Sequence, residues 1–333
     1  MIFTPVRDLA ALVRARKVSP VELAELFLDR LERLGPRYNA VVTVMREHAL
    51  SQARRAEGEI AAGRYRGPLH GIPYGAKDLL ATAGAPTTWG AAPYKDQRFD
   101  FDATVIRKLE EAGAVLVAKL AMIELAGGMG YRQPTASFTG PCINPWDASA
   151  WTGGSSSGSG AAVAAGLVPF AIGSETWGSI LSPAGYCGLA GLRPTYGRVS
   201  RHGAMALCWT LDKLGPLAQT ADDCGLVLDA IAGPDPKDPT ASDRPYRYDA
   251  ADRKGFRFGV ITNVTDGCED AVAENFTRSL GVLRKMGTVE EVTLPDLPYE
   301  QITRTILQVE AASAFEDLIE SGGIAGLTAP EDR

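Results

Sequence analysis

Residues 153–180 read GGSSSGSGAAVAAGLVPFAIGSETWGSI, and this stretch decides the fold. It opens with a glycine and serine loop. The small residues at 161–165 then predict a helix, and the apolar run at 167–172 predicts a strand. A flexible Gly/Ser linker would have polar flanks. Because these flanks are apolar, the glycines predict a tight loop inside a folded core, where the backbone takes positive φ or approaches a ligand closely.

The sequence before this stretch has the order of an α/β protein. A capping box at Ser19 and Glu22 opens a helix, which Gly35-Pro36 is expected to end. A second helix is expected from about Glu47 to Ala62, and a third helical pattern, from Asp102 to Gly113, directly precedes an apolar strand pattern at 114–118. Helices that alternate with buried strands indicate the α/β class.

The sequence after this stretch predicts a long connection and a βαβ-like unit. Residues 233–254 are rich in Pro, Asp and Arg, which is typical of a surface connection. The patterns that follow predict a strand at 256–261, a helix at 271–286 and a strand at 289–294. A last helix is expected over residues 299–321.

Composition excludes several classes of protein. The chain has 333 residues, 45% of them hydrophobic and 22% charged, which is ordinary for a globular protein. Its net charge of -6 leaves no basic field for nucleic acid. Residues 1–17 lack the apolar stretch of a signal peptide, and the weakly polar run at 160–172 is too short to span a membrane. We therefore expect a cytoplasmic protein with no membrane and no direct nucleic-acid partner.

Cysteine and histidine usage argues against metals and disulfides. The five cysteines form no C-x-x-C pair, and the three histidines are scattered. These patterns match neither a disulfide framework nor a zinc site. We expect no metal and no cofactor.

One motif for a serine nucleophile is present but lies in the wrong context. Residues 154–158 satisfy G-x-S-x-G, which would make Ser156 the nucleophile of an α/β-hydrolase. That motif needs a strand just before the serine, and 148–153 does not read as one. Only Glu175 stands before His202 to complete the acid and histidine order. A phosphate loop is disfavoured too, because no G-K-[ST] follows the glycines.

A serine nucleophile without histidine needs another base. Burial can lower the pKa of a lysine so that the lysine can act as this base. Three candidates stand in suitable surroundings: Lys77, Ser155 and Ser179. Ser155 lies 78 positions after Lys77, and Ser179 a further 24.

Around these positions the sequence resembles the amidase signature family. The resemblance rests on Gly71-Ile72-Pro73 with Lys77, Asn144-Pro145-Trp146, residues 153–156, Gly178-Ser179-Ile180 and residues 191–197. It implies an α/β fold with a mixed central β-sheet flanked by α-helices, forming a single amidase domain over 1–333 with a signature core at about 67–233. Because family members usually continue further, it also implies that the carboxyl-terminal part is absent, with lower stability and activity than a full-length relative.

The resemblance also implies catalytic roles. Ser179 is the nucleophile, Ser155 the serine with a cis peptide bond that relays the proton, and Lys77 the base. A lysine with its ordinary pKa near 10.4 is neutral in only about 1 of 2,500 molecules at pH 7. Burial among apolar neighbours must lower its pKa by about 3 to 4 units. We expect the adjacent Asp78 to point away, because a nearby carboxylate would oppose that shift.

Backbone N–H groups near the nucleophile are candidates for an oxyanion hole, the donors that stabilise the developing negative charge. Thr176, Trp177 and Gly178, together with Ser179, are the candidate oxyanion and substrate-binding residues. Trp177 replaces a second glycine of the family and is expected to keep a negative φ or reshape the turn, and to line the acyl pocket. Leu181 replaces an arginine of many relatives, which argues against an acidic substrate.

Three functions stay open on the sequence alone. The first is a free amidase that cleaves the C–N bond of a small-molecule amide through an acyl-enzyme on Ser179. The second is the glutamine-hydrolysing component of an aminoacyl-tRNA amidotransferase, its A subunit, which would have partner subunits. The third is a catalytically silent truncated subunit or binding scaffold. A homo-oligomer is compatible with all three.

Overall fold

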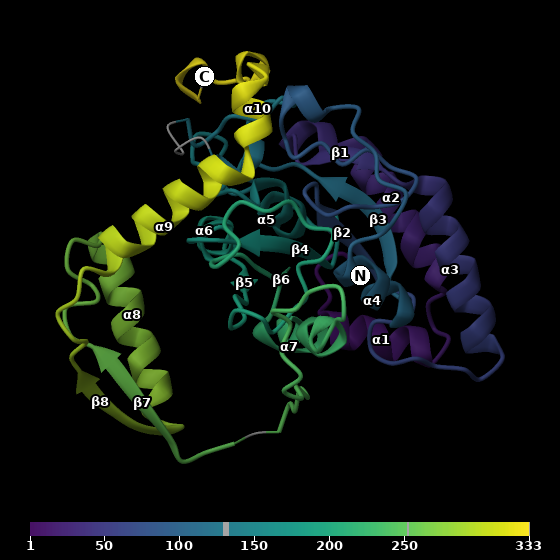
Figure 1. Cartoon of the computed structure of the whole chain (residues 1–333). Coiled ribbons are helices and arrows are strands. Elements are labelled where there is room, and N and C mark those ends of the chain that lie inside the picture. Colours follow the sequence, from purple (N-terminus) through teal and green to yellow (C-terminus); the bar gives the residue numbers. More distant parts are fainter. Residues whose placement is uncertain (129–132, 252, 333) are drawn as a thin grey trace. The chain divides into compact units, whose positions relative to one another are not determined.

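The fold is built on a six-stranded mixed β-sheet. The computed structural model describes residues 1–128, 133–251 and 253–332. The strand order is β1-β3-β2-β4-β6-β5, and helices flank the sheet (Figure 1). This confirms the α/β class with a mixed central sheet. The strands are β1 (Val41–Val44), β2 (Pro73–Lys77), β3 (Val115–Leu120), β4 (Phe170–Glu175), β5 (Ala190–Gly191) and β6 (Lys213–Ala218).

The centre of the sheet is parallel and its edges are antiparallel. β2 pairs in parallel with both β3 and β4, whereas β1, β6 and β5 join in antiparallel pairs. Every residue of β2, β3 and β4 is buried. Such strands carry side chains packed on both faces, which explains their continuous apolar runs in the sequence.

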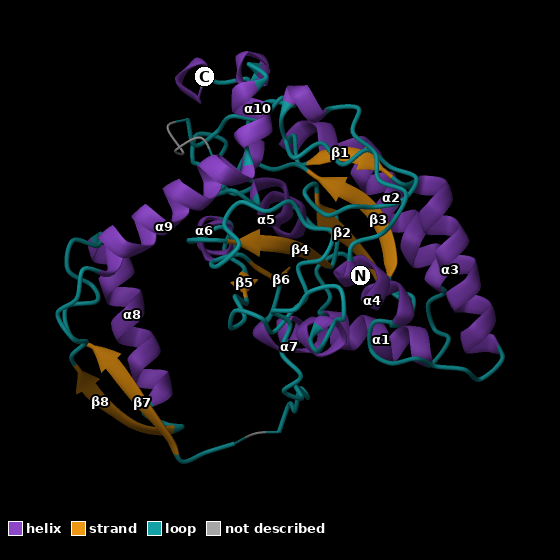
Figure 2. Cartoon of the chain, viewed as in Figure 1, coloured by secondary structure: helices purple, strands orange, loops and turns teal. Residues whose placement is uncertain are grey.

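Helices cover both faces of the sheet, as Figure 2 shows. Along β4, Phe170 and Ile172 belong to one hydrophobic core and Ala171 to the other, as the alternation of a strand requires. The helices of this part are α1 (Val6–Arg14), α2 (Pro20–Tyr38), α3 (Arg46–Ala61), α4 (Thr104–Glu111), α5 (Ser157–Ala164), α6 (Leu181–Tyr186) and α7 (Ala221–Ile231). Short 3₁₀ turns occur at Ala92–Tyr94, Glu124–Gly127, Gly323–Gly326 and Pro330–Asp332.

Helix α2 begins as predicted and ends later than predicted. The Ser19 side chain accepts from the Val21 and Glu22 N–H groups, and the Glu22 side chain completes the capping box. The prediction that Gly35-Pro36 ends the helix is wrong, because the helix continues to Tyr38. Proline has a helical φ and only loses a hydrogen bond within the last turn. Asn39, in the left-handed conformation, ends the helix.

The chain divides into two compact units. The first comprises residues 1–248 and 304–333 and contains the large sheet, and the second comprises residues 249–303. The second unit pairs β7 (Phe256–Ile261) in parallel with β8 (Gly287–Val292), joined through α8 (Asp270–Leu283). This is the predicted βαβ-like unit.

The predicted last helix is two helices in the structure. They are α9 (Tyr299–Ala314) and α10 (Glu316–Glu320), separated at Phe315. Phe315 is buried in the core of the first unit, so packing interrupts a pattern that reads as continuous in the sequence. In the described part of the chain, no helix is both long and apolar enough to cross a membrane.

Candidate active site

Lys77 is the last residue of β2, and its side chain is completely buried. Its Nζ atom lies 2.7 Å from the Ser155 hydroxyl oxygen and 2.9 Å from that of Ser174, and donates to both. Sequence reasoning named Ser155 but missed Ser174. The available signal was a polar residue near the end of the apolar run that forms β4.

Burial is the main influence on Lys77. It lowers the pKa of the ammonium group to about 7, while the carboxylates of Asp212 and Glu175 act in the opposite direction. Asp78 points away, as predicted, because its carboxylate pairs with Lys119 and accepts hydrogen bonds from Thr88. A buried amine with a pKa near neutrality is suited to general-base chemistry.

Ser155 lies in the glycine and serine loop that directly precedes α5. The Gly154–Ser155 peptide bond is cis. Its neighbour Ser156, the nucleophile of the rejected hydrolase motif, is buried and donates its hydroxyl to the Ser174 carbonyl at 3.1 Å. The residues before it, 148–153, form no strand. Ser156 therefore joins the loop to β4 and lacks the exposed position of a hydrolase elbow.

Ser179 stands in the turn between β4 and α6. The Ser156 N–H donates to the Ser179 carbonyl at 3.4 Å, so the loop of Ser155 and the turn of Ser179 are adjacent. The Ser179 hydroxyl has no hydrogen-bond partner among the described residues, and Ser179 lines a cavity. The structure thus brings Lys77 and Ser155 into direct contact and places Ser179 beside them without a direct bond.

A buried carboxylate closes the far end of this turn. Glu175 accepts hydrogen bonds from the N–H groups of Ile180 and Leu181 at 2.8 and 2.9 Å. The N–H groups of Trp177, Gly178 and Ser179 donate to no acceptor in the described part of the chain. Gly178 has φ of 103°, a conformation that glycine adopts readily. These free donors have the chemistry of an oxyanion hole.

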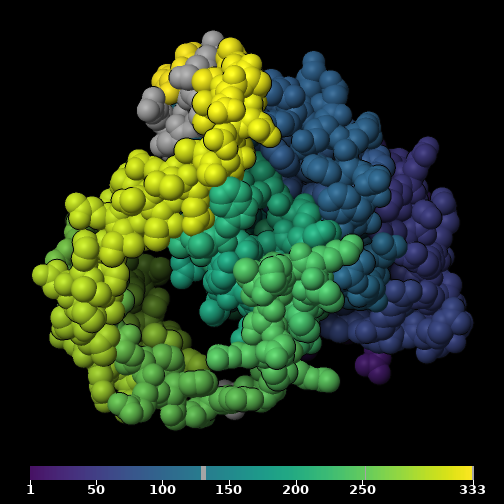
Figure 3. All heavy atoms as spheres, viewed as in Figure 1, coloured from purple at the N-terminus to yellow at the C-terminus, as the bar shows by residue number. Residues whose placement is uncertain are grey.

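The cavity at Ser179 has a volume of about 530 Å³. One wall consists of Trp151, Gly154, Thr176, Trp177, Gly178 and Ser179, and the other comes from α9, with Arg304, Leu307, Gln308, Ala311 and Ala312. Figure 3 shows the yellow carboxyl-terminal residues against the teal surface of the segment that carries Ser179. Three hydrogen bonds hold this part of α9, because Glu310 accepts from the Thr210 N–H at 3.0 Å, from the Thr210 hydroxyl at 2.7 Å and from the Cys208 thiol at 3.0 Å.

Trp177 and Arg304 lie together at the cavity. Trp177 keeps a negative φ, one of the two alternatives expected from the sequence, and its indole lines the cavity. The Arg304 guanidinium lies over the indole, 5.6 Å from the ring centroid. Of the described lining residues, only Arg304 is charged. Leu181 is exposed and does not line this cavity.

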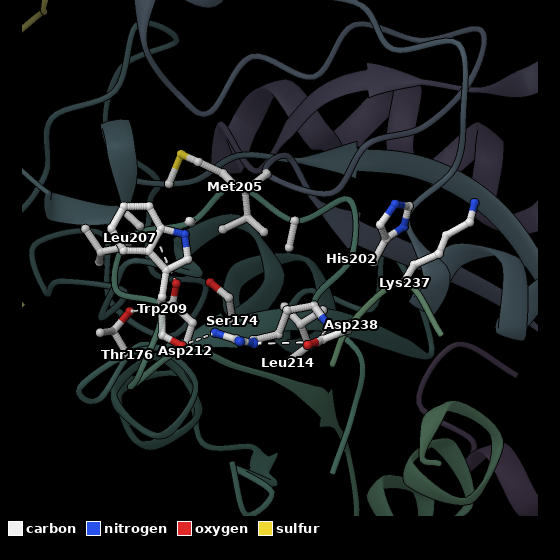
Figure 4. A pocket seen from close by; sticks show the side chains of 15 residues that line it. Ser174, Thr176, His202, Met205, Leu207, Trp209, Asp212, Leu214, Lys237 and Asp238 are labelled. Carbon is white, nitrogen blue, oxygen red and sulfur yellow. Dashed lines mark hydrogen bonds and ion pairs between the residues drawn. The ribbon is translucent and has the colours of Figure 1, made fainter. Parts of the chain in front are cut away.

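A second, smaller cavity of about 220 Å³ lies behind the turn. It shares Ala126, Thr176 and Leu207 with the first cavity. Figure 4 shows Ser174, Thr176 and Asp212 on its wall. The sequence analysis gave Asp212 no role.

The comparisons with known proteins agree with this architecture. The family profile described as Amidase matches residues 22–328. The structure resembles the native peptide amidase from Stenotrophomonas maltophilia with a TM-score of 0.87 and 35% identity, covering 96% of this chain and 68% of that one. It also resembles the A subunit of glutamyl-tRNA(Gln) amidotransferase from Thermotoga maritima, with a TM-score of 0.75, 31% identity and coverage of 93% and 70%.

Two curated relatives illustrate the range of the family. The chain is 40% identical over 320 residues to the A subunit of glutamyl-tRNA(Gln) amidotransferase from Carboxydothermus hydrogenoformans, covering 94% of this chain and 65% of the relative. It is 46% identical over 245 residues to the putative amidase AmiD of Mycobacterium tuberculosis, covering 74% and 50%. The chain therefore spans between half and two thirds of the length of these relatives. With the profile match over most of its length, it belongs to the amidase family, the amidase signature family that its motifs resemble.

Proposed function

We propose that the protein cleaves amide C–N bonds through an acyl-enzyme on Ser179. Neutral Lys77 takes a proton from the Ser155 hydroxyl, and Ser155 takes one from Ser179. The Ser179 oxygen attacks the carbonyl carbon, and the C–N bond breaks as the relay returns the proton to the leaving nitrogen. Water then attacks the ester, which releases a carboxylic acid and restores Ser179.

The observation that carries this proposal is the contact between Lys77 and Ser155. The two atoms lie 2.7 Å apart in a fully buried setting, where the pKa of Lys77 falls to about 7. A neutral amine can accept the serine proton at this distance. The missing bond between the Ser155 and Ser179 hydroxyls is compatible with the proposal, because catalytic hydrogen bonds often tighten only when substrate binds.

The cavity supports a neutral amide with an apolar acyl group as substrate. Its walls contain Trp151, Trp177, Leu307 and alanines of α9, surfaces that favour apolar groups. The peptide amidase and AmiD comparisons support a free amidase.

The glutamine-hydrolysing component of an amidotransferase is the second candidate, favoured by the 40% identity to that protein. In this reading the substrate is glutamine and the released ammonia passes to partner subunits. Hydrolysis of benzamide-type amides against glutamine separates the two. Strong glutaminase activity without cleavage of neutral amides would overturn the free-amidase proposal.

Labelling with a fluorophosphonate, read by intact mass, tests the chemistry directly. We expect one adduct per chain, lost in Ser179→Ala. In Lys77→Ala the labelling rate should fall about 10⁴-fold or more, because residues of a catalytic unit act together. Ser156→Ala keeps Ser155 and Ser179 and serves as the matched serine control. It should still be labelled.

A folded protein without an adduct would support the silent subunit or scaffold instead. The fold is checked in the same samples by a cooperative thermal transition. Oligomeric state and partner binding are then measured by light scattering, since a component of an amidotransferase is expected to need partners for ammonia transfer.

A further inference from the structure

A buried carboxylate outside the proposed triad holds the start of the Ser179 turn. The Asp212 Oδ1 atom accepts from the Thr176 hydroxyl at 2.5 Å. Its Oδ2 atom accepts from the N–H groups of Leu207 and Cys208, each at 2.9 Å. All three partners donate to the side chain, as they would to an ionised carboxylate, which only accepts. Burial raises the pKa of Asp212 above its ordinary value, and these three hydrogen bonds oppose that rise.

Through these bonds Asp212 joins two walls of the Ser179 cavity. Thr176 begins the turn that supplies the free N–H groups, and Leu207 lines the same cavity from another loop. The next residue, Lys213, donates from Nζ to the Thr176 carbonyl at 2.9 Å. Thr176 is therefore held through both its hydroxyl and its carbonyl, and it cannot shift without breaking one of these bonds.

Asp212 also lies close to the base. It lines the second cavity together with Ser174, whose hydroxyl is the second partner of Lys77, as Figure 4 shows for Ser174 and Asp212. Of the two carboxylates that raise the pKa of Lys77 against burial, Asp212 has the larger effect and Glu175 the smaller. One side chain thus acts on both the turn and the base.

We propose that Asp212 is a positioning residue of the amide-cleaving site, whose carboxylate fixes Thr176 at the start of the Ser179 turn and carries its negative charge into the cavity that Ser174, a hydrogen-bond partner of Lys77, also lines. This inference rests on the proposed function. The other titratable or charged groups that act on Lys77 or Asp212 in the described ranges are Glu175, Arg201, Cys208 and Lys213. His202, Lys237 and Asp238 line the same cavity as Asp212. The substitution of Asp212 alone leaves the chemical identity of all these groups unchanged.

The test is the pH dependence of Ser179 labelling, which needs no amide substrate. Asp212→Asn keeps the shape and removes the charge. The acidic limb of the profile is the pH range in which the labelling rate falls on acidification. In Asp212→Asn this limb should move about one unit to lower pH, because Lys77 then loses its proton more easily. Thr176→Val keeps the charge of Asp212 and removes the hydrogen bond from the Thr176 hydroxyl to this carboxylate. It should lower the plateau rate about tenfold through misplacement of the turn, and leave the limb in place.

Asp235→Asn is the matched control. Asp235 is also a buried carboxylate, and it accepts from the hydroxyls of Thr104 and Ser200, but it lines neither cavity. Its labelling profile should equal that of the unchanged protein. If Asp212 and Thr176 act through the hydrogen bond between them, Thr176→Val should lower the plateau labelling rate less in the Asp212→Asn background than in the unchanged protein.

The outcomes separate this inference from the proposed function. If the unchanged protein reacts at Ser179 and Asp212→Asn has the same acidic limb, the inference is wrong and the proposed function stands. If the unchanged protein does not react at Ser179, both fail. Should Asp212→Asn not fold, Asp212→Glu keeps the charge, so its limb should stay in place while the plateau drops. A moved limb in that variant would contradict the inference.

Discussion

The Asp78 carboxylate and the Lys119 ammonium form a completely buried ion pair, with Oδ1 and Nζ 3.0 Å apart. Lys119 also donates to the Leu80 carbonyl at 2.9 Å and to the Thr87 hydroxyl at 2.8 Å. The pair ties β3 to the segment that follows Lys77, and it keeps the charge of Asp78 on the side away from the site.

Breaking this pair should cost much stability. Lys119→Met leaves Asp78 buried without its counter-ion, and such a loss destabilises proteins by about 3–5 kcal/mol. Urea unfolding measures the free energy. The exposed Arg107–Glu111 pair is the control, and Arg107→Met should change stability by less than about 0.5 kcal/mol. Equal effects of the two substitutions would refute a special role for the buried pair.

The reactivity of Ser179 should follow the titration of Lys77. Because the neutral amine is the active form and its pKa is about 7, the labelling rate should be half of its maximum near pH 7, become constant about one unit higher and fall at lower pH. Each unit of acidification below the pKa should reduce the rate about tenfold. A limb near the ordinary lysine value, around pH 10, would show that burial does not prepare the base.

Gly178→Ala should damage the site through backbone conformation alone. A Cβ atom at Gly178 would meet nothing within 4 Å, but the φ of 103° is one that side chains rarely adopt. The turn should shift and the labelling rate should fall about 100-fold, as expected for a displacement of 1 Å.

The matched control for this substitution is Gly185→Ala in α6. It also meets nothing within 4 Å, and its φ is not in the left-handed region. Its labelling rate should not change. A loss of labelling in both variants would mean that any added methyl group near α6 is harmful.

Ala312→Phe should narrow the cavity and exclude large acyl groups. Ala312 is an exposed residue of α9 that lines the cavity, so the larger side chain can be accommodated without a clash in the core. We expect kcat/KM to fall about tenfold for bulky aryl amides and to be unchanged for acetamide. The adjacent Ser313→Phe is equally exposed but does not line the cavity, and it should affect neither substrate.

Local patterns predicted most elements of the fold, and tertiary packing decided the rest. The capping box of α2 and the strand Phe256–Ile261 depend on residues close in the chain, and both occur as predicted. The end of α2 at Pro36 was misjudged because a proline in a final turn costs little. The break at Phe315 could not be read locally, because the distant core that receives this side chain causes it.

The candidate site follows the same division. The family resemblance predicted Lys77, Ser155 and Ser179 as the catalytic residues, and the structure contains the contact between Lys77 and Ser155. Ser174 and Asp212 were missed, since their roles arise from folding. Ser174 meets Lys77 from 97 positions away, and Asp212 meets Thr176 across 36.

Glu175 and Asp212 hold the two ends of the Ser179 turn, and both favour the protonated form of Lys77. A substitution at either carboxylate therefore acts on the hydrogen bonds of the turn and on the pKa of Lys77 together. Substitutions at these two carboxylates are therefore candidates for improving activity in acidic media. Each such substitution should also change how the acyl group fits the cavity. When the substrate range changes through these two residues, the pH optimum should change as well.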